Sequence, residues 1–185
     1  MHLSFINTGG QAGLDAPPIT VEVHLSAGLP AFHVVGIGES HSREIRSRVR
    51  AALISSHLKW PNFNITVNLT PAERVTPGTR FDLTIAVGLL MASQQLPADA
   101  IEGREFIGEP DLDGCLTPSR GQLAAVLVAA QDSTKLCLAM ESSLQMANVE
   151  GSRLIAASDL LSLCATLKAA DPQFAAPQST HPDEA

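Results

Sequence analysis

Apolar and polar residues alternate along the first part of the chain in the pattern of β-strands. The clearest case is residues 19–26 (ITVEVHLS), where every second side chain is apolar, so one face of the strand is buried and the other is polar. Further strands are predicted at 3–8, 31–37 and 64–69. The turn signal at 27–30 (AGLP) predicts that strands 19–26 and 31–37 form an antiparallel hairpin.

A period of 3.6 residues replaces this alternation twice. In residues 40–57 the inward positions are Ile45, Val49, Ala52, Leu53 and Ser56, which predicts an amphipathic helix that ends before Pro61. Residues 82–95 are apolar almost all round, which predicts a buried helix. The stretch 70–79 between them is rich in turn-forming residues.

The remaining chain alternates between short strands and helices. We predict strands at 106–109, 111–116, 135–140 and 153–156, and helices at 121–131, 142–147 and 158–167, the last capped by Ser158. From Asp171 the composition shifts to Pro, Gln, Ala, Ser and acidic residues without periodicity. The sequence therefore predicts one domain at 1–168 with a linker or disordered tail at 169–185. Its fold class is α+β (mixed α/β).

Composition restricts the function classes. The net charge of −7 argues against a nucleic-acid footprint over the whole domain, although a local basic patch is compatible with it. No run of 18 apolar residues or secretory signal is present, so we expect a cytoplasmic protein without a membrane partner. Cys115, Cys137 and Cys164 lack paired spacing and have apolar neighbours, which predicts buried free thiols.

One local concentration of charge stands out in this acidic chain. Arg43, Arg46, Arg48 and Arg50 lie within eight positions of the helix predicted at 40–57. Helical spacing brings Arg43, Arg46 and Arg50 together on one face, and it also predicts the ion pairs Glu39–Arg43 and Glu44–Arg48. Two interpretations stay open: a solvated helix face, or a surface that binds DNA phosphates or an acidic partner.

Motifs for independent catalysis are missing. The chain has no Gly-Lys dipeptide and hence no Walker A loop, and Gly36-Ile37-Gly38 lacks the third glycine of a dinucleotide-binding turn. No histidine and carboxylate stand at HExxH spacing. His24 and His33 are expected to be an exposed pair facing each other on the hairpin rather than a metal site. We expect neither a metal nor a cofactor in this chain.

Six stretches, taken in order, resemble one family. They are APPITVEVHLSAGLP (16–30), RSRVRAAL (46–53), ITVNLTPAE (65–73), RFDLTIAVGLL (80–90), FIGEPDLDG (106–114) and TPSRG (117–121). Together they resemble the N-terminal domain of the ComM/YifB family of magnesium-chelatase-like AAA ATPases, over residues 3 to 168. This resemblance implies the fold of the Lon proteolytic domain, which is a mixed sheet with helices packed on one side.

The same resemblance tests for a peptidase. Lon-type peptidases use a Ser–Lys dyad, in which lysine takes the proton of the attacking serine. Laid over that pattern, this chain has Arg80 at the serine position and Leu123 at the lysine position. Arginine cannot act as the nucleophile, and leucine cannot take a proton. The resemblance thus implies a non-catalytic domain and disfavours a residual Lon-like peptidase.

Function is expected at the level of a larger assembly. In the family this domain precedes an AAA core, so ATP and Mg²⁺ are expected only in a following ATPase domain, and the assembled protein resembles hexameric DNA-remodelling helicases of natural transformation. The expected role is to position DNA or a partner and to aid ring assembly. The alternative is a protein-interaction module without a nucleic-acid role. Relatives usually carry Pro-Lys where this chain has Val75-Thr76-Pro77-Gly78, so any contact of that lysine is in doubt.

Overall fold

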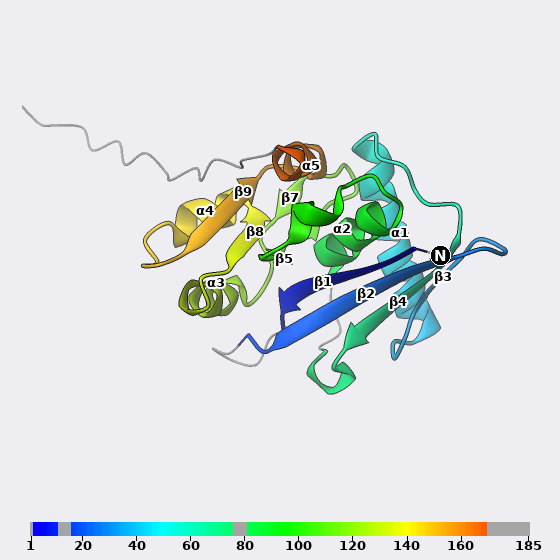
Figure 1. Cartoon of the computed structure of the whole chain (residues 1–185), viewed down its shortest axis with the longest axis horizontal. Coiled ribbons are helices and arrows are strands. Elements are labelled where there is room, and N and C mark those ends of the chain that lie inside the picture. The colour runs from blue at the N-terminus through cyan, green and yellow to red at the C-terminus, as the bar shows by residue number, and fades with distance from the viewer. Residues whose placement is uncertain (1, 11–15, 76–80, 170–185) are drawn as a thin grey trace, which may run out of the picture.

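One seven-stranded sheet forms the centre of the protein. The computed structural model describes residues 2–10, 16–75 and 81–169. The strands of this sheet are β1 (His2–Gly9), β2 (Pro18–Ser26), β3 (Ala31–Val34), β4 (Asn64–Thr70), β5 (Arg104–Ile107), β8 (Lys135–Ala139) and β9 (Arg153–Ala157). They are ordered β3-β4-β2-β1-β5-β8-β9 (Figure 1). Two short strands, β6 (Glu109–Pro110) and β7 (Leu116–Thr117), pair with each other outside it.

The sheet is mixed, and its two halves differ. β2 is antiparallel to both of its neighbours, β1 and β4, whereas β3–β4, β1–β5, β5–β8 and β8–β9 are parallel pairs. Parallel neighbours need crossover connections, and helices supply them between β3 and β4 and in the second half of the chain. The predicted α+β (mixed α/β) class is confirmed.

Helices are distributed over both faces of the sheet. α1 (Glu39–Ser55), α2 (Asp82–Ala92) and α5 (Leu160–Lys168) contribute to the main core. α3 (Gln122–Gln131) builds a smaller core on the opposite face, and α4 (Met140–Met146) contacts α3. Two 3-10 helices, η1 (Ala72–Arg74) and η2 (Ala98–Ile101), lie in the connections.

The expected placement of helices on one side holds only for the half of the sheet built by β1 to β4. In β8, Cys137 and Ala139 face the main core, whereas Leu136 and Leu138 face the core under α3. A strand that is apolar on both faces needs cover on both, which is typical of parallel sheets. The parallel half is therefore sandwiched between helices.

The antiparallel half has one open face, as its alternation predicts. Ile19, Val21, Val23 and Leu25 of β2 are fully buried against the helices. Their neighbours Thr20, Glu22, His24 and Ser26 are only partly buried and lie on the other face. The polar residues of β4 lie on that face too, where Asn68 donates a hydrogen bond to Glu22 over 2.8 Å. These side chains form the partly exposed face of this half of the sheet.

The predicted hairpin of strands 19–26 and 31–37 is wrong. β4 lies between β2 and β3, and β3 runs parallel to β4 rather than antiparallel to β2. His24 and His33 consequently do not face each other, because both are registered with Thr66 from opposite sides. The local sequence pattern does not reveal this strand order, because β4, which follows α1 in the chain, inserts between the consecutive strands β2 and β3.

Several smaller expectations are also corrected. The cap of α5 is Asp159, whose carboxylate accepts the Ser162 N–H at 2.7 Å in a capping box, and the Ser158 hydroxyl donates to that carboxylate. Cys115 is exposed, whereas Cys137 and Cys164 are buried as expected, and all three are free. The strand predicted at 111–116 shrinks to β7, because Asp111 to Gly114 form a turn. Residues 170–185 of the predicted tail lie outside the described residues.

Helix α2 packs closely against the sheet. Ten of its residues are buried, and Gly88 faces β2 so closely that an added Cβ would lie 2.6 Å from Val23 Cγ2. The Ser4 hydroxyl of β1 donates a 2.8 Å hydrogen bond to the Gly88 carbonyl. A glycine costs helix propensity, but here it lets the helix backbone lie directly on the strands.

We expect Gly88→Ala to destabilise the protein by about 1–3 kcal/mol, because overpacking at Val23 outweighs the gain in helix propensity. Chemical denaturation measures the change. The control is Val23→Ala, which makes room for the new methyl group. In the double variant the two losses should be clearly less than additive, and strict additivity would show that the contact is not the cause.

Candidate nucleic-acid interface

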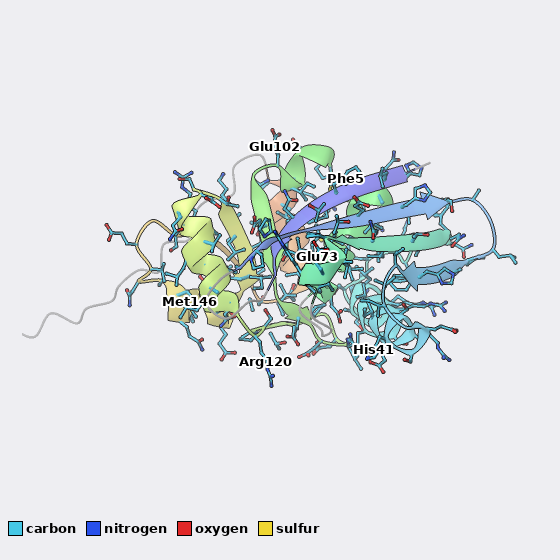
Figure 2. All side chains as sticks on the ribbon, turned by 90° about the horizontal axis from the view of Figure 1, so that it is seen from below. Phe5, His41, Glu73, Glu102, Arg120 and Met146 are labelled. Atoms are coloured by element: carbon cyan, nitrogen blue, oxygen red, sulfur yellow. The ribbon has the colours of Figure 1, made fainter. Side chains whose placement is uncertain are left out.

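The solvent side of α1 carries a row of arginines. The helix buries Ser42, Ile45, Val49, Ala52 and Leu53, so the 3.6-residue period turns the positions between them outward. Arg43, Arg46 and Arg50 line one open groove of about 640 Å³, together with Ser47, Ala51, Ile54 and Ser55. Figure 2 shows this helix at the side of the molecule, with His41 near its start and its side chains projecting outward. We call this feature the arginine groove.

Acidic neighbours balance the arginine groove only in part. The predicted pairs are present: Arg43 Nε lies 3.9 Å from Glu39 Oε1, and Arg48 Nη1 lies 4.0 Å from Glu44 Oε2. Side chains in the first pair are 71% and 83% exposed, so the pair is weak and screened by salt. Among the described residues, no carboxylate lies within ion-pair distance of Arg46 or Arg50. The charges of Arg46 and Arg50 are therefore available to a bound anion.

Arg48 does not belong to the arginine groove. Its guanidinium turns to the other side of α1, where Nε donates to Asp82 Oδ2 at 2.6 Å and Nη2 donates to Asp82 Oδ1 at 3.4 Å. Asp82 is the first residue of α2, and its side chain is 2% exposed. A two-pronged ion pair thus joins α1 to the start of α2. Of the four arginines proposed for binding, Arg48 is engaged inside the protein.

The pKa values of the two partners of this ion pair are raised for different reasons. The hydrogen bond to Asp82 raises the pKa of Arg48. Burial raises the pKa of Asp82 to about 6, although the hydrogen bond and the charge of Arg48 lower it and the charge of Glu109 raises it slightly. Burial is the largest influence on the pKa of Asp82 but not on that of Arg48, because the Asp82 side chain is 2% exposed whereas the Arg48 side chain is 28% exposed.

Sequence reasoning missed this pair although a signal was present. Asp82 is the single charged residue in a helix that is otherwise almost entirely apolar and buried. A carboxylate in that position needs a partner inside the protein, since an isolated buried charge is very costly. The identity of the partner could not be read from the chain, because Arg48 comes from another helix, 34 residues away.

Of the two positions aligned with the Lon dyad, the structure describes one. Arg80 lies outside the described residues. Leu123 is the second residue of α3 and is 44% exposed, with a hydrocarbon side chain that cannot accept a proton. Within the described ranges, no three His, Cys, Asp or Glu residues gather as a metal site would require. None of the helices described there has the length and apolar character needed to cross a bilayer.

The fold and this groove define a class: a mixed α/β domain that carries a cationic helix on the covered face of its sheet. The family model described as subunit ChlI of Mg-chelatase matches residues 21–142. The chain is 39% identical to YifB of Escherichia coli over 168 residues, covering 91% of this chain and 33% of that protein. It is 38% identical to competence protein ComM of Haemophilus influenzae over 161 residues, covering 87% and 32%.

The chain therefore belongs to the magnesium-chelatase ChlI family, and its relatives include ComM and YifB. It spans about a third of the length of these relatives. The resemblance seen in the sequence motifs is confirmed at this level.

Replacing Arg48 by Met should destabilise the protein at pH 7 by roughly 3 kcal/mol, because it leaves the buried Asp82 without a partner while keeping an apolar stem. Arg50→Met is the matched control. It removes an exposed arginine of the same helix and should change the free energy of unfolding by less than about 0.5 kcal/mol. Equal effects of the two substitutions would contradict the assigned role of Arg48.

Asp82 should also make stability depend on pH. Its pKa in the folded protein is about 6, above the ordinary value of 3.8, so protonation favours the folded state. The contribution of protonated Asp82 to the free energy of unfolding is fully present below about pH 4 and is lost as the pH rises through about 6. Relative to Asp82→Asn, the wild type should lose on the order of 3 kcal/mol of unfolding free energy between those limits. A constant difference between the two proteins across this range would refute the assignment.

Proposed function

We propose that this chain is a non-catalytic module of a magnesium-chelatase-like ATPase, in which it positions DNA over the rest of the assembly. Family membership and the length of the relatives support the proposal that this chain acts as part of a larger protein, in which ATP and Mg²⁺ would be bound by a separate ATPase domain. The relative from Haemophilus influenzae is named for competence, which supports a DNA-related role. Leu123, in the place of a basic residue, supports the absence of Lon-like chemistry.

The arginine groove is the observation that carries the DNA part of this proposal. Along the helix axis Arg43 and Arg46 are about 4.5 Å apart, and Arg46 and Arg50 about 6 Å apart. The row thus follows a line of charge about 10 Å long, which suits successive phosphates of one strand. The chain as a whole has a net charge of −7, so this groove would give it a local attraction for a polyanion.

The groove presents few polar groups besides its arginines. Its polar groups besides the arginines are the hydroxyls of Ser47 and Ser55, and Ser47 already donates to the Arg43 carbonyl at 2.9 Å. Contacts of arginine with phosphate fix position and carry no sequence information. We therefore expect binding that is insensitive to base sequence and strongly dependent on salt.

A second candidate is a protein-interaction module that docks its own ATPase core. The observation that favours it is apolar surface at the C-terminal end of the arginine groove. Ile54 is 52% exposed, and Leu112 is 61% exposed and held beside the helix by the Ser55 hydroxyl, which donates to its carbonyl at 2.8 Å. Mixed cationic and apolar surface suits an acidic protein segment better than bare phosphates.

Fluorescence anisotropy with single-stranded and forked DNA, measured against salt concentration, tests the first candidate. We expect the affinity to fall steeply with salt, and the triple substitution Arg43→Glu, Arg46→Glu, Arg50→Glu to reduce the slope of log K against log[salt] by about 2. The matched control reverses three exposed arginines elsewhere, Arg74, Arg120 and Arg153, and makes the same change in net charge.

Three outcomes decide between the candidates. Loss of DNA binding in the groove variant but not in the control supports the DNA role. Equal losses in both variants mean that only net charge matters, and the groove proposal fails. DNA binding absent from the wild type, combined with association with the ATPase core that Ile54→Asp abolishes, establishes the interaction module instead.

A further inference from the structure

The first half of β1 has a partner strand on one side only. β2 pairs with β1 along its whole length, from His2 opposite Leu25 to Gly9 opposite Pro18. On the other side, β5 pairs with β1 only at Asn7 and Glu105. In the described part of the chain, residues 2–6 therefore have no strand beside their outer edge. Figure 2 shows Phe5 on β1 at the margin of this half of the sheet.

An edge of this kind has unused hydrogen-bonding capacity. In an antiparallel pair, every second residue directs its N–H and C=O groups away from the partner strand. Along residues 2–6 those groups face outward, which is the arrangement that accepts an added strand. Proteins usually protect such an edge with charged side chains, proline or a bulge. β1 has none of these between Leu3 and Ile6.

A groove of about 580 Å³ runs beside this edge. One wall is β1 itself, with His2, Leu3, Ser4 and Phe5. The other wall is the end of α2 and the segment after it, with Met91, Ala92, Gln94, Leu96 and Pro97. Four residues of extended chain span about 13 Å, so β1 offers a stretch that a short peptide segment can follow.

The chemistry of the groove selects its occupant. The chain has 12 basic and 19 acidic residues, yet none of the residues that line this groove is one of them. Leu3 and Phe5 are each 54% exposed on it. An acidic or basic segment would lose its hydration here without gaining a charged partner, so the groove favours uncharged, largely apolar side chains.

A second copy of the chain would bring more than a strand to this groove. Its own β1 edge would arrive flanked by Gln94 and Pro97, both of which are exposed. A flexible segment has no such wall. We propose that this groove binds an extended, uncharged peptide segment of a partner protein, which adds as a strand to residues 2–6 of β1. This site is independent of the arginine groove.

The test uses the acetylated and amidated peptide Thr-Val-Thr-Val-Thr-Val, titrated into the ¹⁵N-labelled chain. We expect chemical-shift changes centred on residues 2–6 and on Met91 to Pro97. Amides of β1 that exchange quickly in the free protein should become protected against hydrogen exchange. The same peptide with alternate residues N-methylated cannot donate along the edge, and it should bind at least about tenfold more weakly.

Substitutions on the protein provide the second arm. Leu3→Asp and Phe5→Asp place a charge on the exposed side of the groove without entering the core, and each should weaken peptide binding by about tenfold or more. Leu161→Asp, at an equally exposed leucine of α5, is the matched control and should leave binding unchanged.

The proposal is overturned by any of three results. These are no binding of the peptide, equal binding of its N-methylated form, and shifts that map away from β1. It is also overturned if sedimentation shows that the free chain forms dimers which Leu3→Asp abolishes, because a second copy would then occupy the edge.

Discussion

Helix α2 is buried on nearly every side, and the other elements are positioned by the need to enclose it. β1 and β2 lie behind it, α1 packs along it, and its residues join the main core. A helix in this position cannot turn a polar face to water, so each polar group it carries has to be satisfied by the protein. The Gly88 carbonyl meets this constraint by accepting a hydrogen bond from the Ser4 hydroxyl, and the Asp82 carboxylate meets it by pairing with Arg48.

This constraint divides the basic residues of α1 into two groups. Arg48 lies on the flank of α1 that meets α2 and neutralises a buried carboxylate. Arg43, Arg46 and Arg50 lie on the opposite flank and line the arginine groove. A sequence segment that looks like one cationic cluster therefore has two physical roles. Counting all four arginines as one binding surface would overestimate the charge available to a ligand.

The two proposed binding surfaces differ in chemistry and in position. The arginine groove lies on the helix layer, carries positive charge and suits a polyanion held by ionic contacts. The β1 groove lies at the boundary between the two halves of the sheet, carries no charged residue and suits a peptide held by backbone hydrogen bonds. Both are built on a helix or a strand of the fold, which suits the proposed role of positioning other molecules.

Local periodicity determined much of this structure from the sequence. The buried face of α1, the burial of α2, the open polar face of β2, the Glu39–Arg43 and Glu44–Arg48 pairs and the grouping of three arginines all follow from periods of 2 and 3.6 residues. The family followed from six ordered motifs. These properties depend on residues close together in the chain, where the geometry of a helix or strand fixes which side chains are neighbours.

Only the tertiary structure decided how distant segments meet. It placed β4 between β2 and β3, which removed the expected hairpin and separated His24 from His33 by Thr66. It paired Arg48 with Asp82, and it ended the pairing of β5 with β1 at Asn7, which left the edge of β1 open. Strand order and buried ion pairs depend on contacts between residues far apart in the chain, and those contacts depend on how the whole core packs rather than on any local pattern.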